Sequence, residues 1–88
     1  MDFLHKEFHG VNAGARVRVD IDSAATVRLM DDYNFRRFQS GDRHEYFGGQ
    51  ARRTPVLLTV PRSGNWHVTI DLGGASGRIR HSITLFDT

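Results

Sequence analysis

The segment from Pro61 to Gly74, PRSGNWHVTIDLGG, constrains the fold of this chain more than any other stretch. Its apolar and polar side chains alternate, and the side chains of a β-strand point to opposite faces with a period of two. One face therefore carries Trp66, Val68, Ile70 and Leu72, and the other carries His67, Thr69 and Asp71. The pattern predicts a strand of an antiparallel sheet, with one buried face and one face in solvent.

Similar alternation elsewhere predicts about seven short strands. It is clearest where Val17, Val19 and Ile21 share one face. The expected strands span residues 3–8, 15–22, 25–30, 43–47, 54–60, 66–72 and 79–86, separated by turns that include Gly10 to Gly14 and Gly73 to Gly77. Short strands at regular spacing are typical of small sandwiches and barrels. The predicted fold is all-β, a small antiparallel β-sandwich with one short helix.

The predicted helix begins where the period changes, at Asp31. Asp31 or Asp32 can cap a helix start, and Phe35 and Phe38 lie three residues apart on one helical face. Gly41 suits the position just beyond the C-terminus. We expect a helix over residues 32–39 that bridges the two halves of the sandwich.

The length and composition bound the class of protein. The chain has 88 residues, enough for one domain over residues 1–88. It contains no cysteine, which excludes disulfides and thiolate chemistry. No apolar run is long enough for an export signal or a membrane span. We therefore expect a cytoplasmic domain with no membrane partner.

Arginine dominates the basic residues, with eleven of the twelve, yet the net charge is only +2. The pairs Arg36-Arg37 and Arg52-Arg53 alternate along the sequence with aromatic residues, as stacking recognition of single-stranded nucleic acid requires. The aromatic residues are Tyr33, Phe38, Tyr46 and Phe47. Several of these aromatic residues are also needed to fill a small core, and ten acidic residues lower the positive electrostatic potential that would attract nucleic acid. Nucleic acid is therefore not the expected partner.

The polar face of residues 66–72 is the best candidate for a ligand-binding site. His67, Thr69 and Asp71 lie on it, and Arg80 joins them if the glycine-rich turn forms a hairpin. A histidine and a carboxylate are the minimum for acid–base chemistry, but His67 and Asp71 are too far apart on an extended strand to form a direct pair. No catalytic residue is assigned, and a simple polar sheet face is the alternative reading.

The five histidines are the main candidate metal ligands of the chain. His5, Glu7 and His9 share a strand face, but the two histidines lie about 13 Å apart along an extended strand, too far to bind one ion. A metal site here needs partners from elsewhere in the fold. We expect no metal ion and no cofactor.

The chain resembles the bacterial family known as domain of unknown function 1883. The matching segments are VRLMDDYNF at residues 27–35, YFGG at 46–49, Thr54-Pro55, and PRSGNWHVTIDLGG continuing through Gly77, Arg80 and Ser82. Some members are joined to TIR domains, which implies a sensing or interaction module. The turn, the SG-x-W-x-V element and the closing strand also resemble bacterial jelly-roll modules, which implies a jelly-roll-like sandwich.

The function expected from these residues is non-enzymatic binding of a protein or small molecule. One alternative is a small hydrolase or metal-dependent enzyme that uses His67 and Asp71. Another is arginine-mediated binding of nucleic acid. The partner and the oligomeric state stay open at this point.

Overall fold

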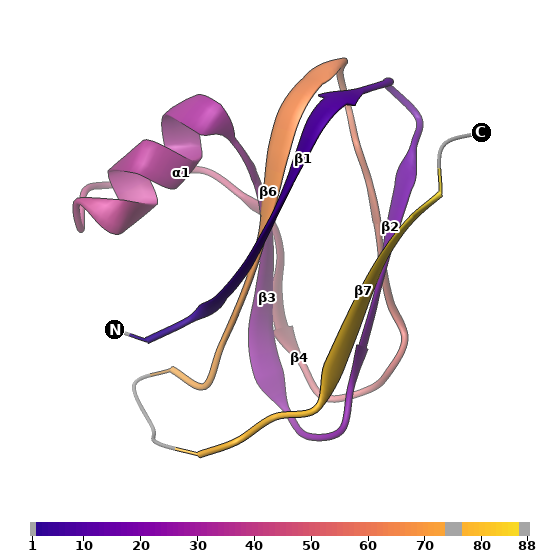
Figure 1. The fold of residues 1–88 in the computed structure, drawn as a ribbon. Helices are drawn as coiled ribbons and strands as arrows, with labels where there is room; N and C mark the ends of the chain where they lie inside the picture. Colours follow the sequence, from indigo (N-terminus) through magenta and orange to yellow (C-terminus); the bar gives the residue numbers. More distant parts are fainter. Residues whose placement is uncertain (1, 74–76, 87–88) are drawn as a thin grey trace.

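The computed structural model describes residues 2–73 and 77–86, which form seven strands and one helix arranged as a β-sandwich (Figure 1). One sheet has the strand order β1-β6-β3-β4 and the other has the order β5-β2-β7. The elements are β1 (Leu4–Val11), β2 (Arg16–Ile21), β3 (Ala25–Asp31), α1 (Asp32–Gln39), β4 (Phe47–Ala51), β5 (Val56–Thr59), β6 (Gly64–Asp71) and β7 (His81–Phe86). The antiparallel, jelly-roll-like sandwich expected from the sequence is confirmed.

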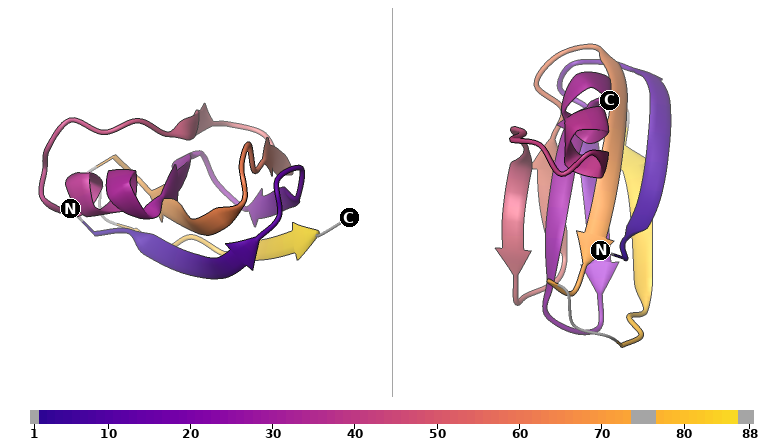
Figure 2. Two further views of the ribbon diagram at one scale, coloured as in Figure 1. Left: turned by 90° about the horizontal axis from the view of Figure 1, so that it is seen from above. Right: turned by 90° about the vertical axis from the view of Figure 1, so that its left-hand side faces the viewer.

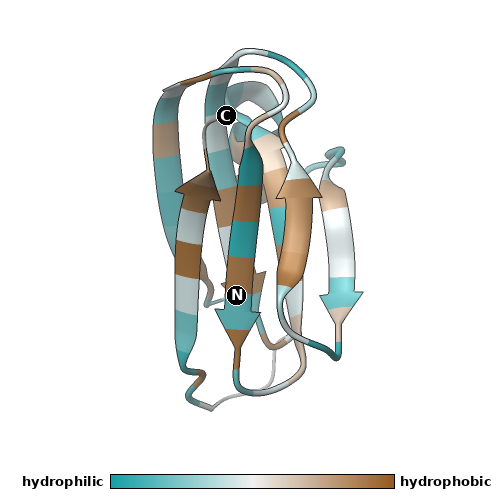
Figure 3. Cartoon of the chain, turned by 90° about the vertical axis from the view of Figure 1, so that its right-hand side faces the viewer, coloured by the Kyte–Doolittle hydropathy of each residue, from teal (hydrophilic) through white to brown (hydrophobic). Residues whose placement is uncertain are grey.

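The main core lies between the two sheets. The predicted inward residues of β2, Val17 and Val19, are fully buried, and Ile21 is nearly so. They face Val27 and Leu29 of β3 and the apolar side of β6. Figure 3 shows the resulting alternation of polar and apolar bands along the strands. Burial on one face of each sheet supplies the main driving force for this arrangement.

A second, smaller core covers the outer face of the β1-β6-β3-β4 sheet. It consists of Met30, Phe35 and Phe38, with Phe3 packed against them. Figure 2 shows α1 in front of β3 and β6, with β1 and β4 on either side. The helix has the predicted bounds, but it does not bridge the two halves of the sandwich. It connects β3 to β4 within one sheet and shields that sheet from solvent.

The start of α1 is fixed by its cap. The side chain of Asp31 accepts a hydrogen bond from the backbone N–H of Asn34 at 2.9 Å, as an N-cap residue does. Gly41 follows the C-cap residue Ser40 with a φ of 76°, the left-handed conformation that glycine adopts without strain. Both predicted boundaries are thus confirmed.

Gly48 and Gly49 belong to a strand, although the predicted strand ends before them at residue 47. Gly48 and Gly49 lie within β4, opposite Arg28 and Val27 of β3. A Cβ atom on Gly48 would lie 2.3 Å from the carbonyl oxygen of Val27. The close approach of two backbones requires glycine at this position, so β4 spans Phe47–Ala51 and not residues 43–47.

The other strand boundaries differ from the predicted ones by a few residues. β1 continues to Val11 beyond the expected residue 8, through an irregular register that includes Gly10. β3 continues to Asp31, β5 begins at Val56, and β7 begins at His81. Of the predicted turn from Gly73 to Gly77, residues 74–76 lie outside the described residues. Among the described residues, no helix has the length and hydrophobicity needed to cross a membrane.

Candidate functional site

The polar side of β6 is buried, which corrects the expectation that it faces solvent. The exposed fraction is 4% for His67, 0% for Thr69 and 3% for Asp71. The alternation itself is as predicted, but α1 and its aromatic side chains cover the polar face (Figure 2). Six consecutive residues of β6, from Trp66 to Asp71, are consequently buried.

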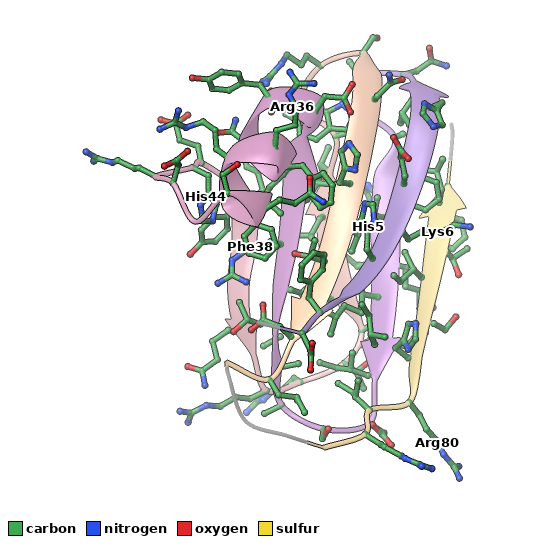
Figure 4. All side chains as sticks on the ribbon, turned by 60° about the vertical axis from the view of Figure 1, so that its left-hand side comes forward. His5, Lys6, Arg36, Phe38, His44 and Arg80 are labelled. Carbon is green, nitrogen blue, oxygen red and sulfur yellow. The ribbon has the colours of Figure 1, made fainter. Side chains whose placement is uncertain are left out.

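Arg80 is not part of this face. The expected hairpin is absent because β6 already has β1 and β3 as neighbours, and β7 pairs with β2 in the other sheet. Arg80 immediately precedes β7, and its backbone N–H donates to Asp22 at 2.8 Å. Figure 4 shows it at the end of the sandwich remote from the labelled α1 residue Arg36.

Asp71 belongs to one of two separate polar networks beneath α1. It forms an ion pair with Arg28 of β3, and its other carboxylate oxygen accepts the backbone N–H of Gly73 at 2.8 Å. The Arg28 guanidinium also lies over the rings of Phe38 and Tyr46, with 5.2 and 5.1 Å to the ring centroids. These contacts tie β3, β6 and α1 together.

His67 forms the second network. Its Nε2–H donates to Oδ1 of Asp32 at 2.5 Å, and a hydrogen bond of 2.9 Å joins its Nδ1 to Nε2 of His5. The Phe35 ring stacks on His67 with centroids 4.2 Å apart, and on His5 with centroids 4.3 Å apart. Both nitrogens of the buried imidazole are engaged and one of its faces is covered.

The two titratable partners of His67 have shifted pKa values. The hydrogen bond from His67 is the main cause that lowers the pKa of Asp32; burial opposes it, and a hydrogen bond from Asn65 lowers the pKa further. The pKa of His5 is also lowered, first by burial and then by the nearby charge of His67, while Glu7 opposes the shift. The network therefore favours an ionised Asp32 beside His67.

The sequence did not show that Glu7, Asp32 and His5 lie together beside His67. Glu7 lies directly opposite His67 in the β1–β6 register, and its Oε1 is 3.9 Å from His67 Nε2. His5 lies diagonally across the same pair of strands. The shared face of His5 and Glu7 was visible in the sequence, but the pairing of β1 with β6 was not. The sequence predicts Asp32 as a possible helix cap, a role that Asp31 fills instead.

The two arginine pairs do not share a surface. Arg36 and Arg37 lie on α1, which follows the last residue of β3. Arg52 and Arg53 lie beside the turn that precedes the first residue of β3, where they line a hollow with Asp22. The length of β3 separates them. Phe38, one of the aromatic residues considered for base stacking, is buried in the second core.

An open hollow of about 410 Å³ lies beside the N-terminal end of α1, and we call it the α1 hollow. Leu29, Met30 and Trp66 form its apolar floor, and the exposed rings of Tyr46 and Phe47 stand at its side. Its remaining lining residues are Asp31, Asn34, His44, Glu45 and Arg62.

An ion pair closes one edge of the α1 hollow. Arg62 pairs with Asp31, and its guanidinium lies over the Trp66 ring at 5.1 Å from the centroid. Burial raises the pKa of Asp31, but hydrogen bonds from Asn34 and Arg62 together lower it below its usual value. The hollow therefore combines an apolar base with a charged edge.

Residues 1–88 match the family model described as a domain of unknown function, DUF1883. A search of curated proteins and a search of solved structures give no match.

Proposed function

The chain belongs to the DUF1883 family of domains of unknown function, and we propose that it is a non-enzymatic binding module whose ligand occupies the α1 hollow. The observation that carries this proposal is the contrast between two sites. His67 and Asp71 are buried, whereas the rings of Tyr46 and Phe47 and the charged side chains of Glu45 and Arg62 beside the hollow are exposed.

The enclosure of His67 argues against its use as a general base. A catalytic base must reach a proton of the substrate, directly or through one water molecule. Both ring nitrogens of His67 already have protein partners, and the Phe35 ring lies against its face. Asp71 is held by Arg28 in the other network, so a hydrolase that uses His67 with Asp71 finds little support.

The α1 hollow has the size and chemistry of a small-molecule site. Sites of this kind span roughly 300–1,000 Å³ and combine apolar walls with a few polar groups that fix the ligand's orientation. Tyr46 and Phe47 expose ring surface here, and Arg62, Glu45 and Asn34 offer hydrogen-bonding groups. A ligand with an apolar or ring-shaped part and adjacent polar groups fits this lining.

We extend the proposal to a module that senses such a ligand in the bacterial cytoplasm. A chain without cysteine has no need of an oxidising compartment. Binding of nucleic acid is less well supported, because the arginine pairs lie at opposite ends of β3. Affinity for single-stranded DNA or RNA that falls steeply with salt would reverse this preference.

The test is capture of small molecules from a bacterial extract. The purified chain is incubated with the extract's metabolite fraction, separated from unbound material, and its retained compounds are identified by mass spectrometry. We expect a retained compound that Phe47→Ala and Arg62→Ala variants lose. Leu57→Ala is the matched control, because Leu57 is exposed on β5 and does not line the hollow.

Two results would count against the proposal. Equal retention by the Phe47→Ala variant and the wild-type chain would place the ligand elsewhere. Conversion of the retained compound into a product by the wild-type chain, and not by a His67→Gln variant, would make the domain an enzyme.

A further inference from the structure

Three possible metal ligands converge at the edge of the network around His67. They are Nε2 of His67, a carboxylate oxygen of Asp32 and a carboxylate oxygen of Glu7, and the three atoms lie within 4.8 Å of one another. We propose that these residues form a binding site for a transition-metal dication, with zinc as the ion that the donor set suits best. The site is independent of the proposed function, because none of the three residues lines the α1 hollow.

Each ligand comes from a different element of the fold. Glu7 lies on β1, Asp32 is the first residue of α1, and His67 lies on β6. The β1–β6 register places Glu7 directly opposite His67, so both side chains rise from the same face of the sheet. A bound ion would join the edge strand, the helix and a central strand at one point.

The surroundings of His67 prepare it for this role. Its ring is held between the hydrogen bond to His5 and the stacked ring of Phe35. A histidine that binds a metal through one nitrogen usually donates its other N–H to a fixed acceptor, and His5 Nε2 can accept it. Asn65 binds the second carboxylate oxygen of Asp32 at 3.3 Å. Two of the three ligands therefore already have supporting partners.

The ligand types select the class of ion. An imidazole nitrogen with two carboxylates suits zinc and related first-row dications, whereas magnesium and calcium prefer oxygen ligands alone. Tetrahedral zinc with bonds of about 2.0–2.1 Å requires its ligand atoms to lie roughly 3.3 Å apart. The distance from His67 Nε2 to Asp32 Oδ1 is 2.5 Å, shorter than this separation, and the distance to Glu7 Oε1 is 3.9 Å, longer than it. Small side-chain rotations are sufficient, because the side chains of Asp32 and Glu7 are 43% and 40% exposed.

Metal binding replaces the proton that His67 now shares with Asp32. Zinc takes the lone pair of His67 Nε2, so the proton of the neutral ring must lie on Nδ1. His67 then donates to His5 Nε2, and His5 carries its own proton on Nδ1. The expected signature is a change of tautomer in both histidines, which a purely structural His67–Asp32 hydrogen bond would not produce.

The experiment is calorimetric titration of the full chain without an affinity tag, using zinc chloride and, separately, magnesium chloride. We expect one zinc ion per chain and no magnesium binding at the same concentrations. Asp32→Asn and Glu7→Gln should each weaken zinc binding at least tenfold. Asp42→Asn, which alters an exposed carboxylate outside both the cluster and the α1 hollow, should leave the affinity unchanged. Nitrogen-15 NMR of the imidazoles should show the tautomer change when zinc is added.

Three results would overturn the proposal. The first is no zinc binding by the wild-type chain. The second is unchanged affinity in both carboxylate variants. The third is loss of binding in a His9→Gln variant with full binding in Asp32→Asn, which would place the ion on the exposed pair of His9 and Glu7, whose nearest atoms are 3.4 Å apart. Circular dichroism without metal confirms the fold of each variant, and Glu7→Gln keeps the test valid if Asp32→Asn does not fold.

Discussion

At the scale of single residues, burial decides what the polar side chains of β6 do. Thr69 is fully buried, and its hydroxyl oxygen has no hydrogen-bond partner among the described residues. Its neighbours His67 and Asp71 are nearly as buried, but both have charged or polar partners. A buried polar group without a partner destabilises the folded state, whereas a paired one becomes destabilising when its partner is removed. The three residues should therefore respond differently to substitution.

Replacing Thr69 with valine should stabilise the domain. The substitution removes the unpaired hydroxyl and keeps the branched shape that suits a strand. We expect the free energy of unfolding to rise by about 1 kcal/mol, the lower part of the range for such groups. Chemical denaturation measures it, with Thr84→Val on β7 as the control. A clear loss of stability would mean that the hydroxyl has a partner in solution.

Replacing Asp71 with asparagine should destabilise the domain strongly. The change leaves Arg28 as an unpaired cation beneath α1, and breaking a buried ion pair costs about 3–5 kcal/mol. Arg80→Ala should change stability by less than about 0.5 kcal/mol, because that side chain is outside the network. Denaturation of both variants tests the contrast, and similar stabilities would show that the Arg28–Asp71 pair is not formed. Because Asp71 variants lose stability, a loss of ligand binding in such a variant reflects damage to the fold and is no evidence that Asp71 contacts the ligand.

At the scale of secondary-structure elements, the sequence predicts the strands and helix well but not what covers them. Alternation identifies two faces of β6, and it cannot say whether the polar face meets water or a helix. One feature of the sequence does indicate a cover over this face: apolar residues lie on the polar side of the neighbouring strands. Phe3 shares its strand face with His5, and Met30 falls on the side of β3 that carries Arg28. These residues need an apolar cover, which Phe35 and Phe38 of α1 supply.

The proposed metal ligands could not be predicted for a related reason. Glu7, Asp32 and His67 are distant in sequence, and only the β1–β6 pairing and the position of α1 bring them together. The pairing of strands depends on non-local contacts, which periodicity within one segment does not encode. The bounds of α1 were predictable because caps and helical spacing are local.

The glycine at position 48 should be irreplaceable for the pairing of β3 with β4. An alanine Cβ would lie 2.3 Å from the Val27 carbonyl oxygen, and the φ of 106° is itself unfavourable for alanine. We expect Gly48→Ala to lower stability by more than about 2 kcal/mol, beyond the cost of positive φ alone. Gly49→Ala is the control, since it also has positive φ but has no atom within 4 Å of the added Cβ. Equal losses in thermal unfolding would refute the steric explanation.

The cap of α1 should contribute to stability in a pH-dependent way. Asp31→Ala removes the hydrogen bond to the Asn34 N–H, and we expect a loss of about 1 kcal/mol at neutral pH. The pKa of Asp31 is lower in the folded than in the unfolded state, so its ionic contribution is present above the unfolded value and is lost as pH falls through the folded value. The stability difference between the wild-type chain and Asp31→Asn should therefore shrink in acid. A difference that grows below pH 4 would contradict this assignment.

At the scale of the whole molecule, the two cores make α1 an integral layer of the domain. The sandwich core holds the sheets together, while the second core and the His67 and Asp71 networks attach the helix to one sheet. A domain of 88 residues buries a modest share of its surface, so a contact that joins several elements has a large relative effect. The Glu7–Asp32–His67 cluster is such a contact, since it joins β1, α1 and β6.

Zinc should therefore raise the thermal stability of the entire domain. An ion that binds only the folded state stabilises it by about 2.7 kcal/mol at a free concentration one hundred times the Kd. For a domain of this size that corresponds to a rise in Tm of roughly 10–20 °C. Differential scanning calorimetry with and without zinc measures the shift, and EDTA should reverse it. The same rise in Asp32→Asn or Glu7→Gln would show that zinc acts at another place, whereas its loss in both, with Asp42→Asn unaffected, would tie the stability of the fold to the cluster.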